Sequence, residues 1–137
     1  WLASYGGKIS GEWAQPKMLE VFEQDPAVYA QADRFMEFSD WLLARLTGNC
    51  DARGAGIAAF KALWNTETGY PGEEYLARVH PALPQMVRQK LRGTHGKPGA
   101  RAGALLPEAA RPSTASVSCP REASCFSMTV RSGSHRA

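Results

Sequence analysis

Lys61 is the residue whose surroundings most suggest chemistry, because it is a single cation in an otherwise apolar segment. Phe60 precedes it, and Leu63 and Trp64 follow it. Such a lysine either extends its charged end to the surface over a packed stem, or presents its three N–H donors to a ligand. Composition alone favours the surface interpretation, and the residues by themselves leave both open.

Trp13 and two carboxylates are the other candidates for ligand contact. The indole of Trp13 could form an apolar wall of a binding site or fill a hydrophobic core. Glu12 and Asp40 lie near the predicted starts of helices, where capping or solvation is the favoured role.

Phosphate and metal motifs are incomplete. Residues 93–98 lack the four-residue gap before Gly-Lys of a phosphate-binding loop, and Pro98 stands where a hydroxyl should hold magnesium. His80, His95 and His135 are far apart in the sequence, so we predict no metal site.

The elements that must position these residues are mostly helices. One buried helix is predicted to end at Gly48, because apolar residues recur at helical spacing at Trp41, Leu42, Leu43 and Leu46. A second short helix carries Lys61 within residues 58–64.

The other elements are predicted from caps, breakers and apolar spacing. Ser10 is expected to cap the helix that contains Trp13, and Asp25-Pro26 is a further helix start. A short strand is predicted near 34–38, and helices over 73–79 and 83–91. With so little strand, we expect these helices to pack on a sheet supplied elsewhere.

Composition separates the chain into two parts. The 137 residues are at most one domain, and every tryptophan and tyrosine precedes residue 93. The net charge is −1 up to Arg92 and +4 afterwards, so the overall +3 belongs to the tail and does not indicate nucleic-acid binding. The tail has almost nothing large to bury.

The cysteine content indicates a reducing compartment. Cys50, Cys119 and Cys125 are an odd number without metal-type spacing, which favours free thiols. We expect no membrane span and no signal peptide. The chain begins with Trp1, which indicates processing or a piece of a longer protein.

The order of the motifs resembles the L-ribulokinase branch of the FGGY carbohydrate kinases. The resemblance covers residues 5–92, resumes at 99–103 and fades past Ala110. The matching segments are Ser10-Gly-Glu-Trp13, Pro16-Lys17, Asp25-Pro-Ala-Val-Tyr29, Ala32-Asp-Arg-Phe-Met-Glu37, Asp40-Trp41, Leu46-Thr-Gly48, Lys61-Ala-Leu-Trp64 and Gly69-Tyr-Pro71. Glu12-Trp13 together with Lys61-Ala-Leu-Trp64 favours ribulokinases over glycerol or xylulose kinases.

The resemblance implies an α/β fold, part of an actin-like, ribonuclease-H-like FGGY N-terminal domain that is mostly helical here, with a disordered C-terminal tail. It implies a cytoplasmic enzyme of L-arabinose catabolism that uses ATP and Mg²⁺ to phosphorylate a ketopentose such as L-ribulose, with no nucleic-acid or membrane partner. Lys61 matches the family's sugar-contacting lysine, which makes a sugar contact the favoured role. Trp13 is the second substrate-binding candidate.

The chain departs from the family in what it lacks. The first strand and turn, the general-base aspartate and the nucleotide-binding domain are missing, so we predict no catalytic residue here and no activity of the fragment alone. We divide it into a partial sugar-binding domain, 1–110, and a disordered tail, 111–137.

The tail allows two explanations, and so does the chain as a whole. The tail is read as translation out of frame, with a natural disordered tail as the alternative. For the whole chain, the alternative is a small non-catalytic helical interaction module. The sequence does not indicate the oligomeric state or the particular ketopentose.

Overall fold

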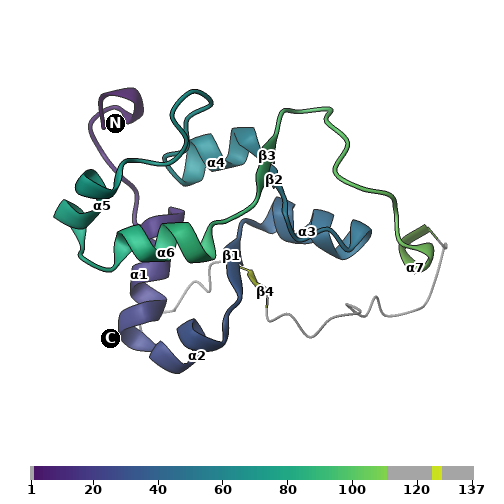
Figure 1. The fold of residues 1–137 in the computed structure, drawn as a ribbon, viewed down its shortest axis with the longest axis horizontal. Coiled ribbons are helices and arrows are strands. Elements are labelled where there is room, and N and C mark those ends of the chain that lie inside the picture. Colours follow the sequence, from purple (N-terminus) through teal and green to yellow (C-terminus); the bar gives the residue numbers. More distant parts are fainter. Residues whose placement is uncertain (1, 111–124, 128–137) are drawn as a thin grey trace, which may run out of the picture.

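The computed structural model describes residues 2–110 and 125–127, which form a mixed α/β structure, as the sequence predicts (Figure 1). Its helices are a 3-10 helix η1 (Leu2–Tyr5), α1 (Ala14–Gln24), α2 (Pro26–Gln31), α3 (Phe38–Thr47), α4 (Ala55–Lys61), α5 (Glu73–Val79), α6 (Leu83–Lys90) and α7 (Pro107–Ala110). Its strands are β1 (Arg34–Met36), β2 (Ala52–Gly54), β3 (Thr94–Gly96) and β4 (Cys125–Ser127).

The start of α1 differs from the prediction. The Oγ of Ser10 accepts a hydrogen bond from the backbone N–H of Glu12 at 3.2 Å, in a turn that precedes the helix. The helix itself begins at Ala14, so Ser10 does not cap it. Trp13 therefore occupies the N-cap position, just before the first turn of α1.

α2 and β1 form where the sequence predicts them. The carboxylate of Asp25 accepts a hydrogen bond from the backbone N–H of Val28 at 3.0 Å, and Pro26 fills the first helical position. The strand β1 follows at once and is buried along its whole length.

α3 is confirmed as a helix, but its predicted burial is wrong. Gly48 ends it in the left-handed conformation, with φ of 71°, as expected for a C-terminal cap. Ala44 is buried, whereas Phe38 is 55% and Leu42 is 42% exposed. β1 and β2 pack on one side of the helix, and part of its apolar surface remains open.

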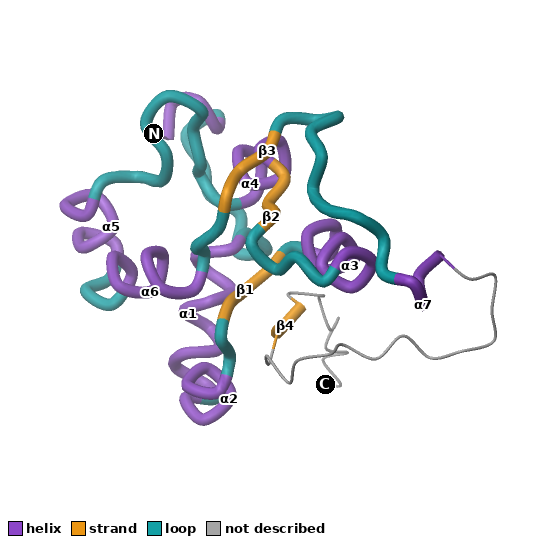
Figure 2. The backbone as a smooth tube through the Cα atoms, turned by 45° about the vertical axis from the view of Figure 1, so that its right-hand side comes forward, coloured by secondary structure: helices purple, strands orange, loops and turns teal. Residues whose placement is uncertain are grey.

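The strands form two separate parallel pairs (Figure 2). β1 pairs with β4, with Phe35 opposite Phe126, and β2 pairs with β3, with Arg53 opposite His95. β1 is the predicted strand, whereas β2 and β3 were not predicted. Apart from 125–127, the predicted tail 111–137, with Cys119, lies outside the described residues.

The core lies where α1, α5 and α6 meet β1. Met18 of α1 and Phe35 of β1 have no exposed surface, and Leu83 and Met86 of α6 are 1% exposed. α1 contacts both α2 and α6. The described residues contain no helix that is long and apolar enough to cross a membrane.

Candidate functional site

Both predicted sugar-contacting residues lie near the ring of Phe60. The ring centroid of Trp13 is 6.3 Å from that of Phe60, and the Nζ of Lys61 is 6.0 Å from the same ring. Trp13 and Lys61 are half-buried, whereas Phe60 is 63% exposed. The start of α1 and the end of α4 thus bring an indole, a phenyl ring and an ammonium group to one part of the surface.

Tyr5 contacts both Trp13 and α4. Its ring meets Trp13 edge-on, with centroids 5.1 Å apart, and its hydroxyl donates a hydrogen bond to the backbone carbonyl of Ala59 in α4. Burial raises the pKa of Tyr5, so the hydroxyl remains a donor at neutral pH. We name Tyr5, Trp13, Phe60 and Lys61 the α1–α4 cluster.

Glu37 is a negative charge that interacts electrostatically with Lys61 of this cluster. It precedes α3 and is half-buried, and burial raises the pKa of its carboxyl, while the charge of Lys61 opposes that rise. An acceptor and a three-donor ammonium close together suit a ligand with several hydroxyl groups. Glu37 was not singled out from the sequence, because its proximity to Lys61 depends on how α3 and α4 pack.

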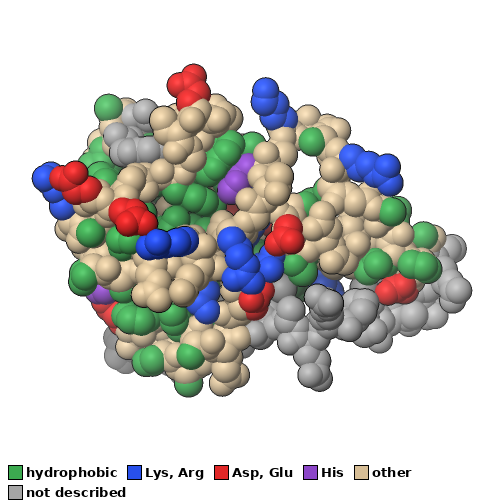
Figure 3. Space-filling model, in the orientation of Figure 1, with side chains coloured by type: hydrophobic (Ala, Val, Ile, Leu, Met, Phe, Trp, Pro, Cys, Tyr) green, Lys and Arg blue, Asp and Glu red, His purple; other side chains and the backbone are tan. Residues whose placement is uncertain are grey.

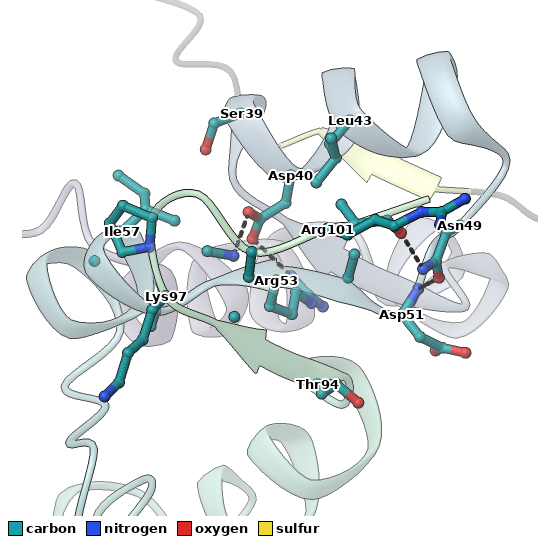
Figure 4. Close-up of a pocket in the computed structure, with 18 residues that line it drawn as sticks. Ser39, Asp40, Leu43, Asn49, Asp51, Arg53, Ile57, Thr94, Lys97 and Arg101 are labelled. Atoms are coloured by element: carbon teal, nitrogen blue, oxygen red, sulfur yellow. Dashed lines mark hydrogen bonds and ion pairs between the residues drawn. The ribbon is translucent and has the colours of Figure 1, made fainter. Parts of the chain in front are cut away.

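Asp40 has a different role from the one that the sequence favours. It is 4% exposed, and its carboxylate accepts a hydrogen bond from the backbone N–H of Gly54 at 2.9 Å and pairs with Arg53 at 3.6 Å. It neither caps its own helix nor faces solvent. Instead it joins α3 to the end of β2, where α4 begins (Figure 4).

Both members of this ion pair are disfavoured as charges by burial. Desolvation raises the pKa of Asp40, and desolvation lowers the pKa of Arg53, even though each favours the charged form of the other. Arg53 also donates to the carbonyl of Phe35 at 2.7 Å and to that of Arg92 at 3.2 Å. The pair therefore holds strands and helices together, and both carboxylate oxygens of Asp40 are already engaged.

A cavity of about 690 Å³ lies beside Asp40, at the carboxyl ends of β2 and β3. Its walls come from α3, β2, the start of α4, β3 and residues 97–102. Lys97 lines it, but its side chain points away from Asp40 (Figure 4). Trp13 and Lys61 do not line this cavity, so the predicted sugar contacts and the cavity are separate features.

Three aromatic rings join the segment after α4 to β3. Trp64 stacks on His95 with centroids 4.5 Å apart, and the hydroxyl of Tyr70 lies 3.1 Å from His95 Nε2. Burial raises the pKa of Tyr70 to about 12, and burial followed by the charge of Arg53 lowers the pKa of His95. At neutral pH both are uncharged, and apolar side chains gather nearby, between α4 and α6 (Figure 3).

Sequence reasoning could not find Asp40, Arg53, Tyr70 or His95 as partners, because each contact joins residues that are distant in the chain.

Glu12 is exposed, and its Oε1 lies 3.6 Å from Nζ of Lys17, in agreement with its predicted solvation. Within residues 2–110 and 125–127, no three His, Cys, Asp or Glu side chains are grouped to hold a metal ion.

Comparison with known proteins shows that the chain is similar to ribulokinases. The chain is 43% identical over 109 residues to a ribulokinase of Shouchella clausii and 40% identical over 109 residues to that of Bacillus licheniformis. The predicted resemblance to ribulokinases is confirmed. A ribulokinase of Mycolicibacterium smegmatis is 38% identical over 110 residues. No family model matches the chain.

The extent of the match is as informative as its identity. It covers 80% of this chain but only 19% or 20% of each of these three relatives. The chain therefore corresponds to about a fifth of the length of the ribulokinases it matches.

Proposed function

We propose that the chain is part of the sugar-binding, N-terminal domain of an FGGY carbohydrate kinase. The parent enzyme would transfer the γ-phosphate of ATP, with Mg²⁺, to the terminal hydroxyl of a ketopentose, L-ribulose, in cytoplasmic L-arabinose catabolism. The observation that carries this proposal is the identity of about 40% to ribulokinases over most of the chain.

In this proposal Lys61 binds the sugar. Its ammonium donates hydrogen bonds to hydroxyl or carbonyl oxygens of the ketopentose and lowers the cost of bringing phosphate charge near. Trp13 and Phe60 provide apolar surface for the carbon face of the sugar. The position of Lys61 at the end of α4, beside these rings, supports the assignment.

The phosphate-transfer machinery belongs to other parts of the parent enzyme. Asp40, a carboxylate beside the large cavity, is engaged by Gly54 and Arg53 and is therefore a poor candidate for a general base. The chain by itself is expected to bind the sugar weakly and to transfer no phosphate.

Titration of the 137-residue chain with L-ribulose, followed by NMR, tests the sugar site. We expect the indole signal of Trp13 and the signals around Lys61 to shift, and Lys61→Met to weaken binding at least about tenfold by removing charge-assisted hydrogen bonds. Lys8→Met, at an exposed lysine, is the matched control. Binding that survives Lys61→Met would refute the role of Lys61.

A coupled phosphorylation assay tests the rest. The chain with L-ribulose, ATP and Mg²⁺ should show no turnover, and ATP-dependent turnover would show that the required parts were misjudged. A chain that binds no ketopentose at millimolar concentration would favour the alternative, a non-catalytic helical module.

A further inference from the structure

α4 ends in a way that leaves its last carbonyl groups in need of partners. The helix ends at Lys61, and its last four carbonyls, as in any α-helix, have no N–H partner within the helix. The carbonyl of Ala58 accepts from the N–H groups of Ala62 at 2.8 Å and Trp64 at 3.2 Å. Leu63 turns the chain between them with φ of 54°, a conformation that leucine rarely adopts.

Two side chains from the N-terminal part of the chain bind two further carbonyls at this end. The hydroxyl of Tyr5 donates to Ala59, and Nε2 of Gln15 donates to the carbonyl of Ala62 at 2.6 Å. Both acceptors lie within two residues of Lys61. The end of α4 is thus held from the same segment that carries Trp13.

Stability alone is a poor explanation for Gln15. The residue is 4% exposed, and within the described part of the chain its Oε1 has no hydrogen-bond partner. A buried amide oxygen without a partner is unfavourable, because it has lost its bonds to water. An apolar side chain of similar size would fill the same space in α1 without the unpaired oxygen, although it would leave the carbonyl of Ala62 without this donor.

The location of Gln15 accounts for its presence. Gln15 is two residues from Trp13, and its acceptor Ala62 is next to Lys61. We propose that Gln15 is a positioning residue that fixes the end of α4 against the start of α1, so that Trp13 and Lys61 contact the same sugar. This inference rests on the proposed function of those two residues.

The test compares three variants of the 137-residue chain. Gln15→Met keeps the length of the side chain but cannot donate to Ala62, and Gln15→Glu donates only when its carboxyl is protonated. Gln24→Met makes the same change at an exposed position of the same helix and serves as the control. L-ribulose affinity, thermal unfolding and the indole signal of Trp13 are measured for each.

We expect Gln15→Met to weaken L-ribulose binding about tenfold with little change in the melting temperature, since removal of the unpaired oxygen offsets the loss of the hydrogen bond to Ala62. Gln15→Glu should bind weakly at about pH 8 and recover toward the original affinity at about pH 5, where a carboxyl near a carbonyl takes up a proton. Gln24→Met should behave as the unchanged chain.

Two results would overturn the inference. One is an unchanged affinity of Gln15→Met, and the other is a lower melting temperature with unchanged affinity of the folded protein, which would make Gln15 purely structural. If the unchanged chain binds no L-ribulose, the proposed function fails. The positioning role is then tested without ligand: the indole signal of Trp13 should differ from that of the unchanged chain in Gln15→Met but not in Gln24→Met.

Discussion

Asp40 offers a sharp test of how this fold is held together, because its two oxygens have separable roles. One accepts a hydrogen bond from the backbone N–H of Gly54 at 2.9 Å, and the other faces Arg53 at 3.6 Å. Asp40→Asn keeps an acceptor for Gly54 and removes the charge. Asp40→Ala removes both.

The magnitudes follow from what remains in each variant. In Asp40→Asn, Arg53 keeps its hydrogen bond to the carbonyl of Phe35, and burial already disfavours the Asp40 carboxylate, as its raised pKa shows. We expect Asp40→Asn to lower the free energy of unfolding by at most about 1 kcal/mol. Asp40→Ala also leaves the N–H of Gly54 without its acceptor, so we expect a loss of about 3 kcal/mol.

Urea unfolding near neutral pH, followed by tryptophan fluorescence, measures both losses, and Trp41 is adjacent to the substituted position. The slope of the unfolding free energy with urea should stay constant across the series. The reasoning is refuted if Asp40→Asn is as destabilising as Asp40→Ala, because the charge and not the hydrogen bond would then dominate.

Two further predictions concern a glycine and a histidine. Gly93→Ala should lower the free energy of unfolding by about 2 kcal/mol or more, because Gly93 has φ of +140° and an added Cβ would lie 2.7 Å from the carbonyl oxygen of Asp51. Gly56→Ala in α4 has open space around the added Cβ and should raise the free energy of unfolding by about 0.5 kcal/mol. Equal urea midpoints for the two variants would contradict this. Burial and the charge of Arg53 lower the pKa of His95, so the unfolded chain binds this proton more readily, and stability should fall as pH drops below about 6.5. His95→Gln should flatten that fall between about pH 6.5 and 5 in urea melts, and an unchanged pH dependence would refute it.

Local rules predicted the elements whose signals lie within a few residues. Gly48 ends α3 because glycine adopts positive φ without strain, and Asp25 caps α2 because its carboxylate reaches an N–H three residues away. Such interactions need no information about distant residues. The same local rule was wrong for Ser10, which makes a turn with Glu12 and leaves α1 to begin at Ala14.

The strands β2 and β3 show where local rules stop. Each has three residues, too few for a periodic pattern, and each exists through pairing with a partner about 40 positions away. Thr94 lies opposite Ala52 only because the chain between them, which includes α4 to α6, returns to the same place. Burial of α3 was overestimated for a related reason, since a helix face is buried only where another element covers it.

In the candidate site, too, some residues were found from the sequence and others only from the structure. Lys61 and Trp13 were singled out from sequence order, as a lone cation among apolar residues and as part of a segment resembling ribulokinases. Phe60 is next to Lys61 in the chain, but its contact with Trp13 depends on how the segment before α1 packs near α4. The proximity of Glu37 to Lys61 depends on packing as well.

The sequence by itself determined most of the helices, the caps at Asp25 and Gly48 and the resemblance to ribulokinases, because these depend on spacing and on residue types that are close together in the chain. Only the tertiary structure decided that Asp40 binds Gly54 and Arg53, that Gln15 holds Ala62, and that Trp13 lies near the ring of Phe60. The reason is physical: burial and long-range hydrogen bonds are properties of how elements pack, and no short stretch of residues encodes them.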